Sequence, residues 1–461
     1  MFEEEKKKLE QRKKSIYQVD VSKDKLHAAV RSGFEKAKKE KLLKRTKLIK
    51  RSSWSIVVAA ILLISFITSV TVSPAFANKV ASIPGMERIV DLIQQDRGLI
   101  ATVENDFYQS LNLSQEKNGI TVTLDGVIAD KNGMVIFYSV QSKKKNLPLE
   151  IEYLKLIDEY YGSFPLHDTT FWGSGSPIIE EKVFSSMMTL ETIEALEIEG
   201  DRKVFNSKLL WKIGLKNGDK VEQFQIPFKF TKTDLASKTI DLNKEVTIEG
   251  QRIIVEKVTI NPIRAEVKLK MDPNNSKTIF SFDNLKFTND IGDEWILNNT
   301  GTAFRNLDGT EWTITMQSPY FNKSDNLKLV FGKIEAIDKD DAFILIDTES
   351  KKFVKQPEKS LFSNLEIENN KVSFIMNMDG DYKLPVSSSF LDSEGKEFFI
   401  KHDFTNYLPG KKYVKGTLMK TAEKGLKLEF ELPSETIKNP LRFDLNYYPT
   451  WIEEDVEVEV E

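Results

Sequence analysis

The chain changes its hydrophobic pattern at two places, and the sharper change comes first. Residues 52–73, from Ser52 to Ser73, carry no charged side chain and are rich in Ile, Val, Leu and Ala. About 20 such residues cross the ~30 Å hydrocarbon core of a bilayer as a helix. The pattern therefore predicts a transmembrane helix over residues 52–73. The alternative is a buried helix of a soluble protein, but such helices rarely run so far without a charge.

Before this segment, apolar residues recur at helical spacing within a basic stretch. Leu26, Val30, Phe34 and Ala37 form a narrow apolar stripe, and Ser22 is a good N-cap for the helix that would carry it. The stripe either rests on anionic membrane lipid or docks onto a cytosolic partner. We take its four residues as the candidate partner-binding surface.

A second amphipathic segment follows the predicted span. Met86, Ile89, Val90 and Ile93 lie on one face of a helix that would begin after a Pro-Gly turn. This pattern predicts a short helix within a juxtamembrane segment of residues 74–100. The helix either packs on the first external domain or lies at the membrane interface.

The second change of pattern comes near Gly119, where alternation with period two replaces helical spacing. The runs ITVTLDGVIAD and MVIFYSV, separated by a Lys-Asn-Gly turn, predict a β-hairpin. Strand-like runs with frequent turn signals then recur to residue 461, a habit typical of β-sandwiches. We expect a mainly β fold, with an N-terminal cytoplasmic helix and one transmembrane helix before about three extracytoplasmic Ig-like β-sandwich domains.

This pattern also predicts how the chain is divided. Two stretches, beginning at Asn118 and Glu249, both read as a turn, an alternating strand, a break and a second strand, which favours repeated modules. The tail EEDVEVEVE alternates Val and Glu, and is either a charged edge strand or a frayed end. The predicted segments are 1–51 (cytoplasmic, basic and helical), 52–73 (transmembrane), 74–100 (juxtamembrane), 101–235 (first β domain), 236–347 (second, Ig-like β domain) and 348–461 (third β domain).

The net charge of −4 hides an asymmetry between the two sides of the predicted span. Residues 1–51 hold 18 Lys and Arg against 8 Asp and Glu, whereas the rest of the chain holds 48 basic and 62 acidic residues. Short basic flanks stay in the cytoplasm during membrane insertion. We therefore expect a cell-membrane protein that crosses once, with its N-terminus cytoplasmic and its C-terminal region extracellular.

Several kinds of chemistry are disfavoured by residue types. The chain has no cysteine, which excludes disulfides, Cys-ligated zinc and thiol catalysis. Its three histidines lie in different predicted segments, and the acidic turns at 338–341 and 379–381 do not fit an EF-hand loop. The basic arm lacks the interleaved aromatic residues typical of nucleic-acid binding. We expect no enzyme activity, no cofactor, no metal site and no nucleic-acid partner.

A small-x-small motif follows the predicted span at Ala75-Phe76-Ala77 and resembles a signal-peptide cleavage site. The basic region before the span is far longer than the leading region of an ordinary signal peptide, and the apolar run is also too long. These lengths favour a signal-anchor that stays attached. Ala75 and Ala77 are the candidate site of a regulated cut.

The order of these motifs carries a family resemblance. The segments KLHAAVRSGFEKAKKEKLLKR, SPAFANKVASIPGMERI and NGITVTLDGVIADKNGMVIFYSV, with the apolar span between the first two, resemble a bacterial single-pass membrane family. Its members carry a conserved N-terminal domain of unknown function followed by Ig-like domains, and some are described as anti-sigma-factor-like. The resemblance covers about the first 140 residues, and the second unit from about Ile240 is similar to the Ig-like domain that follows.

The resemblance implies a cytoplasmic segment that binds an extracytoplasmic-function sigma factor and an external region that senses the cell envelope. This sequence departs from the zinc-binding anti-sigma domains, because their cysteine ligands are missing. The alternative is a membrane-anchored cell-surface binding module without a transcriptional role. In either case, an external cell-wall ligand or protein is the expected partner outside the cell.

Overall fold

The computed structural model describes residues 86–461, apart from 131–132, 144–148, 159–161, 164–177, 180–182, 192–208, 219, 232–234, 298–302, 307–308, 325, 360, 378–385, 402–410, 422–424 and 434–436. The chain divides into two compact units, Met1–Ser73 and Pro74–Glu461, and every described residue belongs to the second. Among these residues, no helix is long and apolar enough to cross a membrane. The span predicted over residues 52–73 lies outside the described part and stays a prediction.

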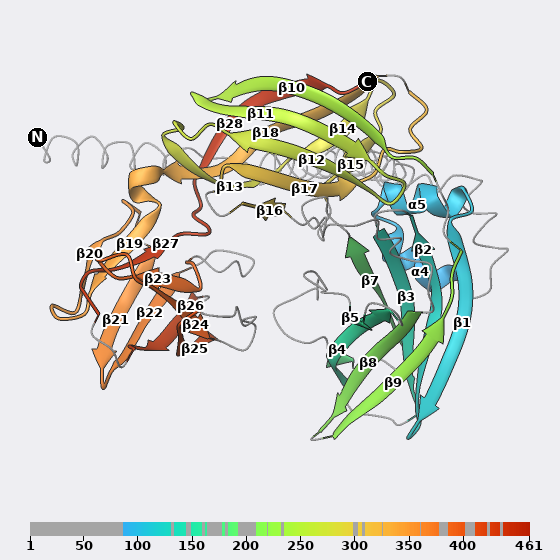
Figure 1. Ribbon diagram of the computed structural model, residues 1–461, viewed down its shortest axis with the longest axis horizontal. Coiled ribbons are helices and arrows are strands. Elements are labelled where there is room, and N and C mark those ends of the chain that lie inside the picture. Colours follow the sequence, from blue (N-terminus) through green and yellow to red (C-terminus); the bar gives the residue numbers. More distant parts are fainter. Residues whose placement is uncertain are drawn as a thin grey trace, which may run out of the picture. The chain divides into compact units, whose positions relative to one another are not determined.

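The described residues are mainly β, as the period-two alternation predicted, with two short helices at the start (Figure 1). The helices are α4 (Met86–Ile93) and α5 (Arg97–Glu104). The amphipathic helix predicted from Met86, Ile89 and Ile93 is therefore present as α4. The strands that follow form three modules, and each has its own buried core.

The first module is a sandwich of two antiparallel sheets. One sheet has the order β1-β2-β3-β7, and the other has the order β5-β4-β8-β9 with β6 paired to β4. The predicted hairpin is confirmed as β2 and β3, which pair from Ile120 with Ser142 to Ala129 with Met134. The strands are β1 (Tyr108–Lys117), β2 (Ile120–Ala129), β3 (Gly133–Ser142), β4 (Leu149–Asp158), β5 (Gly162–Ser163), β6 (Ile178–Ile179), β7 (Val183–Glu191), β8 (Leu209–Asn217) and β9 (Lys220–Phe228).

The second module is also a two-sheet sandwich. The sheet β10-β11-β12-β17-β16 faces the sheet β13-β18-β14-β15, and β28 pairs with the free edge of β18. The strands are β10 (Lys238–Ile248), β11 (Gln251–Ile260), β12 (Arg264–Met271), β13 (Lys277–Phe282), β14 (Lys286–Asn289), β15 (Glu294–Ile296), β16 (Ala303–Arg305), β17 (Glu311–Gln317), β18 (Leu327–Asp338) and β28 (Trp451–Glu459).

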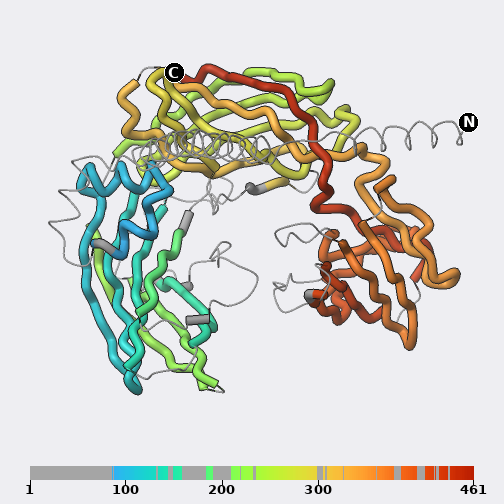
Figure 2. The backbone as a smooth tube through the Cα atoms, turned by 180° about the vertical axis from the view of Figure 1, so that it is seen from behind, coloured from blue at the N-terminus to red at the C-terminus, as the bar shows by residue number. Residues whose placement is uncertain are grey.

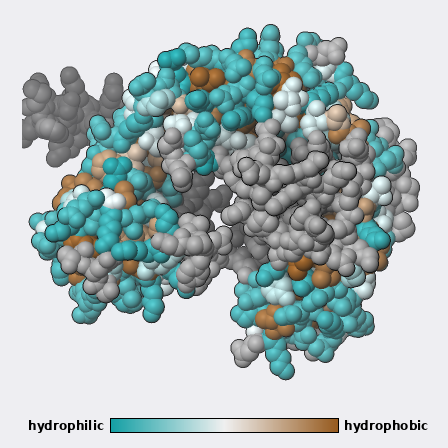
Figure 3. Space-filling view, viewed as in Figure 1, coloured by the Kyte–Doolittle hydropathy of each residue, from teal (hydrophilic) through white to brown (hydrophobic). Residues whose placement is uncertain are grey.

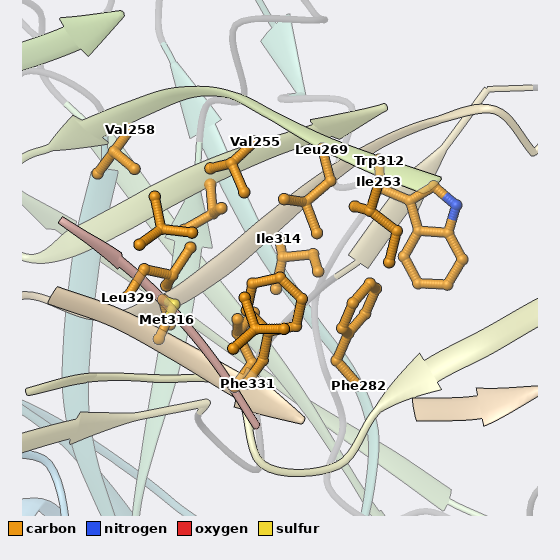
Figure 4. Close-up of a cluster of buried hydrophobic side chains, with 14 of the residues drawn as sticks. Ile253, Val255, Val258, Leu269, Phe282, Trp312, Ile314, Met316, Leu329 and Phe331 are labelled. Atoms are coloured by element: carbon orange, nitrogen blue, oxygen red, sulfur yellow. The ribbon is translucent and has the colours of Figure 1, made fainter. Parts of the chain in front are cut away.

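Aliphatic side chains and a few aromatic rings fill the core between these two sheets (Figure 4). Phe282 of β13 meets the ring of Trp312 edge-on at 5.6 Å and that of Phe331 at 5.7 Å. Edge-to-face pairs of this kind add about 0.5–1.5 kcal/mol beyond the area that they bury. The alternation of apolar and polar residues seen in the sequence thus turns one side of each strand toward this core.

The third module is a single nine-stranded sheet with the order β20-β19-β27-β23-β24-β25-β26-β22-β21. The pair β24–β25 is parallel, and the other pairs are antiparallel. The sheet curls, since Phe374 of β22 contacts Phe443 of β27 at 5.9 Å across the core. The strands are β19 (Phe343–Asp347), β20 (Lys352–Lys355), β21 (Phe362–Glu368), β22 (Lys371–Asn377), β23 (Ser389–Leu391), β24 (Glu397–Lys401), β25 (Tyr413–Lys420), β26 (Gly425–Glu431) and β27 (Leu441–Asp444).

Strand pairing departs from the predicted division at two points. The strand β19, which the sequence assigned to the second module, lies in the sheet of the third. The last strand, β28, returns to the second module and pairs with β18 (Figure 2). The third module is therefore inserted between two neighbouring strands of the second. A pattern of alternation cannot foresee this, because it marks a strand without naming its partner.

Candidate functional site

The residues proposed from the sequence as functional lie outside the described part of the chain. Neither the partner-binding stripe of Leu26, Val30, Phe34 and Ala37 nor the candidate cleavage residues Ala75 and Ala77 can be placed. The strongest candidate among the described residues is a polar and apolar contact that we call the inter-module joint. It comprises the start of α5, the β2–β3 turn, the β11–β12 turn and the segment Gln317–Phe321.

The helix α4 leads the chain onto the first module. Its residues Met86, Ile89 and Ile93 are buried and share a cluster with Val135 and Phe137 of β3. Of the two placements predicted for this helix, the structure shows packing on the first β module. The apolar face predicted from the sequence is thus used for docking on the sheet β1-β2-β3-β7.

The helix α5 begins with a side-chain cap that the sequence analysis missed. Asp96 has an extended backbone, and its Oδ1 accepts a hydrogen bond from the backbone N–H of Leu99 at 3.0 Å. Asp is among the preferred N-cap residues because it satisfies one of the unpaired N–H groups of the first turn. The cap fixes where α5 starts and holds the carboxylate of Asp96 at its N-terminus.

The same carboxylate forms a buried ion pair with the second module. Oδ2 of Asp96 accepts from Nη1 of Arg264, the first residue of β12, at 2.9 Å. The two side chains are only 9% and 6% exposed. Removing two charges from water costs several kcal/mol per ion, so good geometry is needed to offset it. Such a pair therefore adds little net stability, but it requires Asp96 and Arg264 to be held in one relative position.

A second buried carboxylate joins the two modules at the neighbouring turn. Asp130 follows β2, and its Oδ1 accepts from the N–H of Gly133 at 2.8 Å within its own turn. Its Oδ2 accepts from the N–H of Ile263 at 2.9 Å, which lies in the β11–β12 turn. Asp130 thus satisfies one backbone donor from each module.

Close backbone approach brings α5 against the segment after β17. The amide of Gln317 donates to the carbonyl of Gln95 at 2.8 Å and accepts from the N–H of Arg97 at 3.3 Å. A Cβ on Gly98 would lie 2.7 Å from the backbone nitrogen of Ser318. Only glycine fits there without a shift of the helix or of the segment.

Apolar contacts complete the joint. Ile263 is buried in one cluster with Leu99 and Val103 of α5 and with Phe107, which follows the helix. The ring of Phe107 meets that of Phe321 edge-on at 5.5 Å. Hydrogen bonds, an ion pair and apolar packing therefore fix α5 to both modules at once.

One titratable group lies where α4 meets the first module. Asp125 sits at the bulge of β2, and the hydroxyl of Ser139 donates to its Oδ1 at 3.1 Å. Burial raises the pKa of Asp125 to about 6, against the lowering effects of the Ser139 bond and of the positive charge of Arg88 on α4. The hydroxyl of Tyr108 donates to the carbonyl of Asp125 at 3.3 Å. The contact between α4 and the first module therefore contains a carboxyl group whose charge changes at a pH of about 6.

A third buried carboxylate marks the contact between the second and third modules. Glu335 of β18 accepts from the backbone N–H of Tyr448 at 3.0 Å and from the hydroxyl of Ser281 at 2.7 Å. The hydroxyl of Thr450 donates to the carbonyl of Ala336 at 2.5 Å. These bonds hold the returning chain just before β28 begins.

Other surfaces of the described residues offer less. No group of three or more His, Asp or Glu side chains among them could hold a metal ion. The visible face in Figure 3 is mostly hydrophilic, with apolar residues scattered over the described part. Scattered exposed apolar residues are ordinary and mark no binding surface.

The joint residues were missed because each gives a weak local signal. Asp96 before the short run Leu99–Val103 is an N-cap signal, but α5 spans only eight residues. The partner of Asp96 lies 168 residues further along the chain. Arg264 is a charged residue at the start of a strand whose apolar and polar residues otherwise alternate. This could be noticed in the sequence, but it does not identify Asp96 as the partner of Arg264.

Two regions of the chain match described sequence families. Residues 47–142 match a domain of unknown function (DUF4179), and residues 237–369 match a family of unknown function (DUF5643). The first region includes the predicted span and ends at β3, and the second runs from β10 to β21. Both matches agree with the resemblance described above only at the level of domains without a known function.

Comparisons with whole proteins add little. No curated protein matches the chain. Among solved structures, a conserved domain protein from Bacillus anthracis matches with 18% sequence identity and a TM-score of 0.34, over 54% of this chain and 84% of that one.

Proposed function

We propose that this protein is a single-pass membrane regulator of the anti-sigma-factor-like type. Its cytoplasmic segment, residues 1–51, binds an extracytoplasmic-function sigma factor, and its external β modules sense the cell envelope. The observation that carries the proposal is the buried pair of Asp96 and Arg264. It fixes the first helices after the predicted span to two β modules.

Such an arrangement is suited to passing on a change in the external region. A regulator needs an element with two arrangements whose balance is shifted by an external event. The joint supplies one of these arrangements, because its buried carboxylates hold α5 in one position. A change in the second module that separates Arg264 from Asp96 would release α5. If a flexible linker stood in place of the joint, it would absorb the same change without affecting α5.

On the cytoplasmic side, the proposal assigns binding to the apolar stripe of Leu26, Val30, Phe34 and Ala37. The basic residues around the stripe hold the segment against anionic lipid. Phe34 is its largest member and is the natural residue to test, since large aromatic residues dominate the binding energy of interfaces.

Affinity capture with the full-length chain tests this assignment. We expect the wild-type chain to capture a sigma factor and Phe34→Glu to lose it. Lys36→Gln is the matched control, because it makes the same change in net charge on the opposite side of the predicted helix. Loss of capture by both variants, or by neither, would contradict the assignment.

A second experiment separates this function from simple anchoring. Residues 1–51 are exchanged for an unrelated basic segment, and transcription from a sigma-dependent reporter is measured. The regulator proposed here loses control of the reporter. Unchanged control would leave the chain as a membrane-anchored surface-binding module.

Release by proteolysis is a further part of the proposal and has its own test. Ala75 and Ala77 supply the small side chains that a signal-type peptidase accepts. Ala77→Arg should abolish a released external fragment on immunoblots, and Ala77→Ser should keep it. If the fragment is absent from wild-type cells with and without envelope stress, regulated cutting at this site is excluded.

A further inference from the structure

The strand β28 runs from the third module to the neighbourhood of the inter-module joint. It is the last strand of the chain, and it returns to the second module after the whole of the third (Figures 1 and 2). Its neighbour on one side is β18, with which it pairs from Glu335 opposite Trp451 to Lys328 opposite Glu459. It therefore follows β18 over most of that strand's length.

One end of β28 follows directly from the third module, whose core contains Tyr448. The two residues before it, Pro449 and Thr450, follow Tyr448, whose backbone N–H is bonded to the buried Glu335. Trp451, the first residue of the strand, donates from its indole N–H to Asp283 at 2.8 Å. A displacement of the third module relative to β18 would break the contacts at this end of β28 before those further along the strand.

The middle of β28 is attached by apolar packing and by charge. Its residues Ile452, Val456 and Val458 are buried in the core of the second module. Its outward side chains are mostly acidic, and the carboxylate of Glu457 lies 2.8 Å from Nζ of Lys328 on β18. Of the two alternatives for the tail EEDVEVEVE, a charged edge strand or a frayed end, the pairing with β18 shows the strand.

The far end of β28 lies beside the segment that leads to the joint. The N–H of Leu327 donates to the carbonyl of Glu461 at 3.0 Å, and the N–H of Val460 donates to the carbonyl of Leu327 at 2.8 Å. Leu327 begins β18, six residues after Phe321 of the joint. Backbone pairing at this end thus fixes the start of β18.

Side-chain contacts continue from this end into the joint. Lys238 lies 4.0 Å from the carboxylate of Glu461 and 5.8 Å above the ring of Tyr320. Tyr320 donates to the carbonyl of Ala236 at 3.0 Å, and its ring meets that of Phe321 at 5.1 Å. Phe321 in turn packs on Phe107, directly after α5. The two contacts of Lys238 are exposed and individually weak. Tyr320 also packs against the core cluster that contains Val458 and Val460 of this end, and aromatic contacts carry the path from Tyr320 onward.

We propose that β28 couples the third module to the inter-module joint, so that withdrawing β28 from β18 loosens α5. The inference deepens the proposed function, because it names the third module as the part whose displacement alters the joint. The contacts form a continuous path from Glu335 through β28 and Tyr320 to Phe107. Coupling through such packed networks is a matter of a few-fold to tens-fold in an equilibrium constant.

Hydrogen exchange in the purified full-length chain, reconstituted in lipid nanodiscs, measures this coupling. Glu457→Lys sets two positive charges against each other on β18 and β28. Asp455→Lys is the matched control, because Asp455 is an exposed residue of the same strand and the change in charge is identical. We expect Glu457→Lys to speed exchange in β28 and, by about threefold or more, in α5. Asp455→Lys should leave α5 unchanged.

A disulfide lock provides the reverse test. Lys333 and Glu453 are directly opposite each other, and opposite residues of antiparallel strands have Cα atoms about 4.5–5.5 Å apart, within the range of a disulfide. Because the chain has no cysteine, Lys333→Cys with Glu453→Cys introduces one unique bridge and leaves Lys328 in place. When this bridge is oxidised in the Glu457→Lys chain, exchange in α5 should return to the wild-type rate.

Fast exchange in β28 with α5 unchanged would overturn the coupling, as would acceleration of α5 that the oxidised bridge does not reverse. If Glu457→Lys leaves the amides of β28 protected from exchange, Val458→Asp is used instead, because it places a charge in the core and withdraws the strand. The same two results for α5 would then overturn the coupling. The measurement needs no sigma factor. Its failure is therefore distinct from failure of the proposed function, which the capture experiment tests.

Discussion

The buried pair of Asp96 and Arg264 allows a prediction with a defined size. In Asp96→Asn, the cap on α5 survives, because Asn and Asp are nearly equal as N-caps. The negative charge is lost, and the guanidinium of Arg264 remains only 6% exposed beside a neutral amide. Breaking a buried pair from one side costs about 3–5 kcal/mol. We expect the free energy of unfolding to fall by about 3 kcal/mol, a large part of the ~5–15 kcal/mol of a typical domain.

The cap and the charge can be separated by further variants. Asp96→Ala loses both, so it should cost about 1 kcal/mol more than Asp96→Asn. The double variant Asp96→Asn with Arg264→Met removes both partners, and it should recover part of the loss because no charge is left buried. The difference between the double variant and the sum of the single variants gives the coupling energy of the pair.

Denaturant unfolding followed by tryptophan fluorescence provides the assay. Trp211 reports on the core of the first module, and Trp312 reports on that of the second. Arg97→Gln is the neighbouring control, because Arg97 pairs with Asp293 in an exposed site where such pairs contribute about 0–1 kcal/mol. A loss in Asp96→Asn no larger than in Arg97→Gln, or a coupling energy near zero, would refute this account of the joint.

Three further predictions concern other contacts. Burial raises the pKa of Asp125 to about 6, so ionisation of this carboxyl group destabilises the fold, and its contribution to stability falls as pH rises from about 4 to about 7. Asp125→Asn should therefore raise the melting temperature at pH 7.5 and leave it unchanged near pH 4. A melting temperature raised at pH 4 and unchanged at pH 7.5 would contradict this pH dependence. Gly98→Ala should destabilise the chain in denaturant unfolding despite a helix-propensity gain of about 1 kcal/mol, because its Cβ meets Ser318 at 2.7 Å; a net gain in stability would refute the close approach. Glu335→Met should cost about 1–3 kcal/mol in thermal unfolding, because it removes the acceptor of the backbone N–H of Tyr448; an unchanged melting temperature would count against this contact.

Local patterns in the sequence were sufficient for the elements but not for their assembly. The apolar face of α4 and the alternation of β2 and β3 are set by neighbouring residues, and both were predicted. The helix α5 was missed because it is short and contains a glycine near its start. The return of β28 to β18 could not be foreseen, because nothing in an alternating strand names the sheet that it joins.

The candidate site likewise depends on contacts that local sequence patterns do not predict. Asp96 and Arg264 come together only through the fold, since 168 residues separate them and neither stands in a recognisable motif. Asp130 likewise reads as an ordinary turn residue until the backbone of Ile263 is placed beside it. The predicted cytoplasmic stripe around Phe34, by contrast, is entirely a product of local spacing, and it stays a prediction.

The central claim is that the inter-module joint controls a cytoplasmic regulatory output. Sigma-dependent transcripts measured in cells that carry Asp96→Asn or Arg97→Gln, at matched protein levels, test it most directly. We predict that Asp96→Asn changes these transcripts in the same direction as deletion of the protein, and that Arg97→Gln leaves them at the wild-type level. Transcripts that stay at the wild-type level in Asp96→Asn, with the joint shown to be weakened by denaturant unfolding, would contradict the claim.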